Sequence, residues 1–355
     1  MHTNTKVRIK DIAKLAGVSE GTVDRVIHKR GEVSAKSKEA VEKVLDEINY
    51  SPNILARSLA SKKQFIISCL IPEYVAGDYW EAISNGFKKA ENQFEQYNVI
   101  LKILYYNQYD IESFKQSTAT ILNELPDALI LAPIFKSETI TFTNTLTSLH
   151  IPFCFIDSLI EETEYTSYYG QNSFLSGYIG GKLLFSDLEQ NSQVLIIRNN
   201  RKGAESNQTL KRIEGFHKFI NDSDLQNVEL INIEFNDVDN EENLSKLQQV
   251  CLQNSNIKAA IVFNSKVYRL ATLLSEINMG HVKLIGYDLL SENVKYLKNN
   301  IVSYLISQRP EKQSYMIIND LCKKYIFNQD IQRNNFVPID ILIKENIEDY
   351  LNFQE

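Results

Sequence analysis

The side chains that could do chemistry follow the apolar segments of this 355-residue chain, one after another. Asp157 follows PFCFI, and Asn264 follows AAIVF. Carboxylates and amides exchange hydrogen bonds with hydroxyl groups, and an Arg donates two bonds from a fixed fork. Such a set is typical of carbohydrate recognition. The candidates are Tyr79, Trp80, Asp157, Gln171, Asn172, Arg212, Asn264, Asp288 and Gln308.

The elements that must position these side chains are strands that alternate with helices from Gln64 onward. Fully apolar segments such as FIISCLI (65–71) and DALILAP (127–133) predict parallel strands covered on both faces. These units are too many for one ordinary sheet, so we expect two lobes. Ligands bind beyond the carboxyl ends of such strands, and two facing lobes bring two of these edges together around a cleft.

Each candidate also has a purely structural interpretation. Asp157, Asn264 and Asp288 could cap the helices that follow them. Arg212 could be a surface cation, and Trp80 could belong to the core. Their shared location near strand ends favours a ligand cleft.

The stretch from Val7 to Ser61 predicts a different kind of chemistry. Its first apolar stripe has helical spacing and comprises Ile9, Ile12, Ala13, Leu15 and Ala16. Gly17 then stands where a helix end needs a residue that tolerates positive φ, and Ser19 can cap a second helix at about 20–27. Two short helices joined by a tight glycine turn form a helix-turn-helix, whose second helix enters the DNA major groove.

Two further helical patterns follow in this stretch. Ser34 can cap a third helix, whose apolar stripe comprises Val41, Val44, Leu45 and Ile48. After Pro52, residues 53–60 form a helical pattern that is too short to be stable alone in water. We therefore expect that last helix to be ordered only against a partner.

Charge is divided unequally along the chain. Residues 1–63 hold 13 Lys and Arg against 8 Asp and Glu, a net charge of +5. The remainder holds 25 against 37, a net charge of −12. A small basic module on a large acidic body indicates nucleic acid as the partner of the N-terminal part only.

The N-terminal stretch resembles the DNA-binding region of the lactose-repressor (LacI/GalR) family of transcription factors. The resemblance rests on IKDIAKLAGVS, TVDRVI, VSAKSKEAV and NYSPNILARSLAS, in that order. It implies that Arg25 and Glu20 read base edges and that Leu59 wedges into a central minor-groove step. Alternatively, Leu59 packs on its dimer mate and never touches DNA. The implied DNA-binding residues are Ser19, Glu20, Gly21, Thr22, Arg25, Asn53, Ala56 and Leu59.

The body resembles the ribose- and galactose-binding branch of the type I periplasmic-binding-protein fold, over about residues 64–345. The expected fold class is an all-α helix-turn-helix domain plus hinge helix, then an α/β two-lobe domain with two doubly wound parallel sheets. We expect the DNA-binding domain at 1–50 and the hinge at 51–63. The first lobe would comprise 64–170 plus about 309–330, and the second 171–308 plus about 331–355.

Together, the two parts predict a transcriptional regulator, expected to be a repressor, that binds a pseudo-palindromic operator as a homodimer. A small-molecule effector, expected to be a sugar or sugar derivative, would bind between the lobes. The alternatives are a sugar sensor acting mainly as an activator, and a solute-binding protein without a DNA role.

Other function classes lack support in the sequence. We find no nucleophile–base pair, metal-ligand spacing or phosphate loop, so we expect no enzyme, no metal and no cofactor. Four scattered cysteines in apolar surroundings, and a start without an apolar run, predict a cytoplasmic protein. No apolar stretch is long enough to cross a membrane, so no membrane partner is expected.

Overall fold

The computed structural model describes residues 8–28, 31–48, 64–199, 206–223, 225, 228–236 and 239–353. The chain divides into two compact units, Met1–Lys62 and Lys63–Glu355. The predicted hinge at 51–63, with Asn53, Ala56 and Leu59, lies outside the described residues.

The described residues of the N-terminal unit form three helices, α1 (Ile9–Ala16), α2 (Glu20–His28) and α3 (Ala35–Glu47). Their core comprises the buried side chains of Ile12, Ala13, Val23, Val41 and Val44. Leu15 was expected on the apolar stripe, and this was wrong. Its side chain is 64% exposed, because position 15 falls off the face that carries Ile12 and Ala13.

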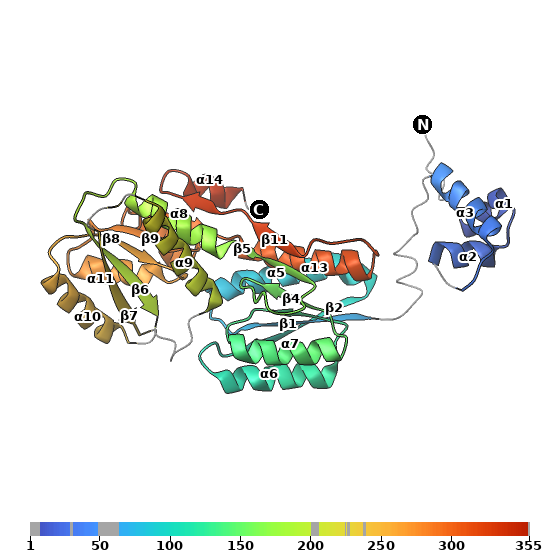
Figure 1. Ribbon diagram of the computed structural model, residues 1–355, viewed down its shortest axis with the longest axis horizontal. Coiled ribbons are helices and arrows are strands. Elements are labelled where there is room, and N and C mark those ends of the chain that lie inside the picture. The colour runs from blue at the N-terminus through green and yellow to red at the C-terminus, as the bar shows by residue number, and fades with distance from the viewer. Residues whose placement is uncertain are drawn as a thin grey trace. The chain divides into compact units, whose positions relative to one another are not determined.

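The first lobe of the larger unit is built on a parallel sheet of six strands in the order β11-β5-β4-β3-β1-β2. The strands are β1 (Phe65–Pro72), β2 (Val99–Tyr106), β3 (Ala128–Leu131), β4 (Phe153–Ile156), β5 (Ser167–Gln171) and β11 (Asn334–Val337). Helices cover both faces of the sheet (Figure 1): α5 (Tyr79–Phe94) and α13 (Pro310–Tyr325) on one, α6 (Ile111–Glu124) and α7 (Lys136–Ser148) on the other. A short 3-10 helix, η1 (Glu95–Tyr97), follows α5.

The second lobe repeats this architecture with the strand order β12-β10-β9-β8-β6-β7. Its strands are β6 (Gln193–Asn199), β7 (Glu229–Phe235), β8 (Ile257–Val262), β9 (Lys283–Tyr287), β10 (Tyr304–Ser307) and β12 (Asp340–Leu342). Only the pairing of β12 with β10 is antiparallel among the described strand pairs. Its helices are α8 (Ser173–Phe185), α9 (Asn207–Asp222), α10 (Asn240–Gln253), α11 (Val267–Glu276), α12 (Ser291–Lys298) and α14 (Ile347–Asn352).

Within the described residues, the chain passes between the two sheets three times. The first crossover follows β5, the second lies between β10 and α13, and the third joins β11 to β12. The apolar pattern indicated no strand between β4 and α8, but β5 lies there. The second lobe was expected to include about 331–355, and β12 (Asp340–Leu342) does belong to the second sheet, whereas β11 (Asn334–Val337) belongs to the first.

The two buried tyrosines of β5 explain why an apolar pattern does not indicate this strand. Its sequence, SYYGQ, has no apolar run, yet all five residues are buried. The Tyr168 hydroxyl donates to the carbonyl of Asp157 over 3.2 Å, and that of Tyr169 donates to Asp320 Oδ2 over 2.6 Å. Buried polar groups are tolerated when they are hydrogen-bonded, so this strand can be central without being aliphatic.

The predicted fold class is confirmed for the described residues, as a helix-turn-helix unit and a two-lobe α/β unit with mainly parallel sheets. Among these residues, no helix is long and apolar enough to cross a membrane.

Candidate functional site

The second helix of the N-terminal unit presents the predicted DNA-reading side chains. Glu20, Gly21 and Arg25 are exposed on α2, whereas Thr22 is half-buried. Opposite them, Val23 is fully buried in the core, which fixes the rotation of α2 about its axis. The structure therefore brings these predicted residues together on one outer face.

The turn before α2 is defined by two local features. Gly17 has φ 64, and its backbone N–H donates to the carbonyl of Ala13. Ser19 then caps α2, because its Oγ accepts the Thr22 N–H over 3.2 Å. The Oγ atoms of Ser19 and Thr22 also lie 2.9 Å apart, so both hydroxyls stabilise the helix start.

In the larger unit, a buried polar network joins the two lobes, and it begins at Asp157. This residue follows β4 with φ 70, and it is 5% exposed. Its Oδ1 accepts the Tyr79 hydroxyl over 2.6 Å and Gln208 Nε2 over 2.9 Å. Tyr79 begins α5 in the first lobe, whereas Gln208 lies on α9 in the second. Asp157 therefore connects the lobes through Gln208.

Gln308 extends the network within the second lobe. Its Oε1 accepts Gln208 Nε2 over 3.1 Å and Arg212 Nη2 over 3.2 Å. Its Nε2 donates to both carboxylate oxygens of Asp288, at 3.0 and 3.2 Å. We call Tyr79, Asp157, Gln208, Arg212, Asp288 and Gln308 the interlobe network.

Arg212 is a buried cation rather than a surface residue, since only 1% of it is exposed. Its Nη1 donates to the carbonyl of Phe263 over 2.8 Å, and its Cζ lies 3.8 Å from the centre of the Tyr287 ring. This position depends on close packing of α8 against α9. A Cβ at Gly177 would lie 1.9 Å from the carbonyl oxygen of Arg212, so no larger residue fits there.

Burial controls the ionisation of this network. The pKa of Asp288 is raised to about 7, chiefly because burial desolvates its carboxylate; Arg212 and Gln308 oppose this rise, and the charge of Asp157 adds to it. Burial, followed by the Asp157 charge, also raises the pKa of the Tyr79 hydroxyl well above its usual range. That hydroxyl therefore remains a donor to Asp157 at neutral pH.

Three further predicted ligand residues are not members of the network and make structural contacts. Asn172 caps α8 by accepting the Leu175 N–H over 2.9 Å, and Asn264 accepts the Lys266 N–H over 2.8 Å. Trp80 is buried against the Tyr79 ring, with ring centres 5.1 Å apart. Assignment of these three residues to ligand contacts remains a prediction.

Gln171 joins two of the crossovers. Its Nε2 donates to the carbonyl of Ser307 over 3.0 Å, which ties the end of β5 to the end of β10. Its Oε1 is buried without a partner among the described residues. An unmatched buried acceptor is unfavourable, so this position suits a ligand or water that can donate a hydrogen bond.

Sequence reasoning missed Gln208 as a member of the site. The available signal was its spacing, because Gln208 precedes Arg212 by four residues and so lies on the same face of α9. Gln208 does not directly follow a strand, unlike predicted residues such as Asp157 and Asp288.

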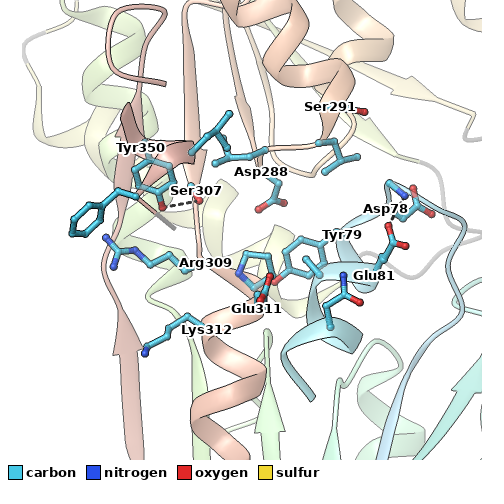
Figure 2. Close-up of a pocket in the computed structure, with 18 of the residues that line it drawn as sticks. Asp78, Tyr79, Glu81, Asp288, Ser291, Ser307, Arg309, Glu311, Lys312 and Tyr350 are labelled. Carbon is cyan, nitrogen blue, oxygen red and sulfur yellow. Dashed lines mark hydrogen bonds between the residues drawn. The ribbon is translucent and has the colours of Figure 1, made fainter. Parts of the chain in front are cut away.

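A cavity of about 1010 Å³ adjoins the network on one side (Figure 2). Asp288 and Ser291 face Tyr79 and Glu311 across it, and Tyr350 forms a side wall. Small-molecule sites commonly span about 300–1,000 Å³, so this cavity is at the large end of the range.

The side wall is tied to the crossovers by an ion pair. Arg309 Nε and Nη2 donate to the two carboxylate oxygens of Asp340, at 2.5 and 2.9 Å. The Tyr350 hydroxyl donates to Asp340 Oδ2 over 2.5 Å. The second crossover, the third crossover and α14 are thereby held together beside the cavity.

The two units match two known families. Residues 8–53 match the lacI family of bacterial regulatory proteins. Residues 67–325 match the periplasmic binding protein domain.

Curated transcriptional regulators are similar to this chain over part of its length. The HTH-type transcriptional repressor PurR of Edwardsiella ictaluri is 27% identical over 292 residues, which cover 79% of this chain and 80% of that protein. Catabolite control protein A of Streptococcus mutans is 35% identical over 101 residues, which cover 28% of this chain and 30% of that protein.

Solved structures share the two-lobe unit. A protein described as a LacI transcriptional regulator from Bacteroides fragilis is 33% identical, with a TM-score of 0.76 over 81% of this chain and 100% of that chain. A glucose-galactose binding protein from Geobacillus stearothermophilus has a TM-score of 0.70 at 18% identity, over 81% of this chain and 99% of that chain, and so shares the fold.

Proposed function

Because this chain belongs to the lacI family of bacterial regulatory proteins and carries a periplasmic binding protein domain, we propose that it is a transcriptional repressor controlled by a carbohydrate effector. The observation that carries the effector part of the proposal is the interlobe network, in which Gln208 of the second lobe donates both to Asp157 of the first lobe and to Gln308 of the second. Its groups are amides, carboxylates, one guanidinium and one phenol, the chemistry that recognises hydroxyls.

At the DNA, a homodimer would place two copies of α2 in successive major-groove half-sites of a pseudo-palindrome. Arg25 would bond a guanine through its O6 and N7, and Glu20 would accept a hydrogen bond from cytosine N4. From the sequence resemblance, Asn53, Ala56 and Leu59 would contact the minor groove between the half-sites. The protein would act in the cytoplasm.

At the effector site, hydroxyl groups of a sugar would replace hydrogen bonds that the interlobe network makes to itself. Because Asp157 and Gln208 come from different lobes, this exchange would change the relation between the lobes. The change would reach the DNA-binding part as a coupling free energy, typically about 1–3 kcal/mol. We infer that the cleft binds its ligand without chemical turnover.

The test combines selection of DNA with a ligand screen. An operator is first selected from randomised duplexes with the full chain, and its dissociation constant is then measured by fluorescence anisotropy with and without a panel of sugars. We expect a palindromic site, and at least one sugar that changes the affinity by about 5–150-fold. The Arg25→Ala variant serves as the control for specific binding.

The outcomes separate the parts of the proposal. No sequence-selective binding would contradict the repressor function. Selective binding that no sugar changes would contradict the carbohydrate effector. Recovery of a chemically altered sugar, checked by chromatography, would contradict binding without turnover.

A further inference from the structure

The cavity beside the interlobe network is larger than one sugar ring requires, and its far wall is aromatic. We infer that the effector is an uncharged saccharide of at least two linked rings, whose outer ring lies against the C-terminal helix α14. This inference rests on the carbohydrate effector proposed above and specifies its class.

The dimensions of the cavity indicate an extended ligand. Its volume is about 1010 Å³, and it reaches from Tyr79 and Asp288 at the network to Tyr350 and Phe353 on the C-terminal segment. A ring that bonds the network would occupy only the inner end. The outer end would then remain available to a second ring.

Aromatic side chains line that outer end. Tyr350 and Phe353 of the C-terminal segment contribute to this wall, and Tyr315 of α13 also lines the cavity. Phe353 is 92% exposed, so its ring is not needed for the core of the described structure. Aromatic faces carry a negative quadrupole that attracts the C–H face of a sugar ring, so this wall suits a saccharide.

The wall is held in place, which favours binding. Ile347 of α14 is fully buried, and Glu348 forms an ion pair with Lys298 over 2.5 Å. The Tyr350 hydroxyl donates to Asp340, which also binds Arg309. A wall that is already ordered loses less conformational entropy when a ligand binds.

The charges around the cavity favour an uncharged ligand. Among the described residues, three cations line the cavity: Lys89 and Arg309 are paired with Glu311 and Asp340 respectively, and Lys312 lies 5.4 Å from the centre of the Tyr315 ring. The lining carboxylates outnumber these cations, and they are Asp78, Glu81, Asp288, Glu311 and Asp349. A phosphate or carboxylate on the ligand would therefore meet an excess of negative charge.

Isothermal titration calorimetry on the full chain tests the inference. The probes are cellobiose, maltose, lactose and xylobiose, their component monosaccharides glucose, galactose and xylose, and glucose 6-phosphate and galacturonate as anionic probes. We expect at least one disaccharide to bind roughly tenfold more tightly than its component monosaccharides, and more tightly than either anion.

Two variants show whether the C-terminal wall causes that preference. Phe353→Ala removes an exposed wall residue and should reduce the preference for the disaccharide to about threefold or less. Leu252→Ala is the matched control, because Leu252 is an equally exposed apolar residue (89%) on α10 and does not line the cavity. It should keep the full preference.

The results distinguish this inference from the proposed function. A monosaccharide that binds as tightly as its disaccharide, tighter binding of an anion, or an unchanged preference in Phe353→Ala would overturn the extended, uncharged ligand and leave the carbohydrate effector standing. Absence of binding by every saccharide would overturn both.

Discussion

The side-chain amide of Gln208 donates to that of Gln308 over 3.1 Å, at the point where the two lobes meet. Gln208 also donates to Asp157 in the first lobe, and Gln308 donates to Asp288 in the second. The two side-chain amides thus link the buried carboxylates of Asp157 and Asp288 through a chain of hydrogen bonds. The proposed effector site and the contact between the lobes therefore involve the same atoms.

Replacement of Gln208 tests this relationship. Gln208→Leu keeps the side-chain size but removes the donor to Asp157, so the free energy of unfolding should fall by about 1–3 kcal/mol. Affinity for any sugar that binds the wild type should fall as well. Urea unfolding and calorimetry measure the two effects. Gln253→Leu, at an exposed position on α10, is the control and should change neither.

Replacement of Arg25 tests the DNA-reading face of α2. Arg25→Ala should weaken operator binding by about 1–3 kcal/mol and relax base preference at one position in each half-site. Selection from randomised duplexes measures the preference. Lys43→Ala removes an exposed cation from α3 and should retain the base preference. An unchanged preference in Arg25→Ala would remove this residue from base reading.

Buried Asp288 should make stability depend on pH. Burial raises its pKa to about 7, whereas an unfolded Asp titrates near about 3.9. The folded chain thus keeps a proton that the unfolded chain has released. Its stabilising contribution is present at low pH and is lost as the pH rises through about 7.

The variant Asp288→Asn isolates this contribution. Between about pH 5 and pH 8, the wild type should lose about 2–3 kcal/mol of unfolding free energy relative to Asp288→Asn. Urea unfolding at both pH values measures the difference, and Asp330→Asn, an exposed carboxylate on the link after α13, is the control. Parallel pH curves for wild type and Asp288→Asn would contradict the raised pKa.

Much of the fold followed from local patterns. Apolar runs marked most strands, and Gly17 and Ser19 marked the turn and cap before α2, as the structure confirms. The failures share a physical cause. The strand β5 and the buried face of α1 depend on what surrounds them, and periodicity alone does not contain that information.

The site was only partly predictable for the same reason. Residues that follow strands, such as Asp157 and Asp288, could be found because a parallel sheet directs its strand ends to one edge. Gln208 lies one helical turn from Arg212, and its role emerges only when α9 packs beside Gln308. The C-terminal wall around Phe353 depends on the return of the chain to the cleft, which no local pattern encodes.

The close approach of α8 and α9 gives the last prediction. A Cβ at Gly215 would lie 1.8 Å from the carbonyl oxygen of Phe174, so Gly215→Ala must separate the two helices. We expect a loss of at least about 1–3 kcal/mol in unfolding free energy. Because Arg212 lies one turn earlier on α9, sugar affinity should also fall.

Gly280→Ala is the matched control for this substitution. A Cβ at Gly280 would meet no atom within 4 Å, and the residue has no positive φ that would strain an alanine. Its unfolding free energy should stay unchanged or rise by about 0.4–1 kcal/mol, because alanine restricts the unfolded chain. Equal stability of the two variants would show that α8 and α9 can separate without loss. Arg212 would then owe its position to the carbonyl of Phe263 and the ring of Tyr287 rather than to helix packing.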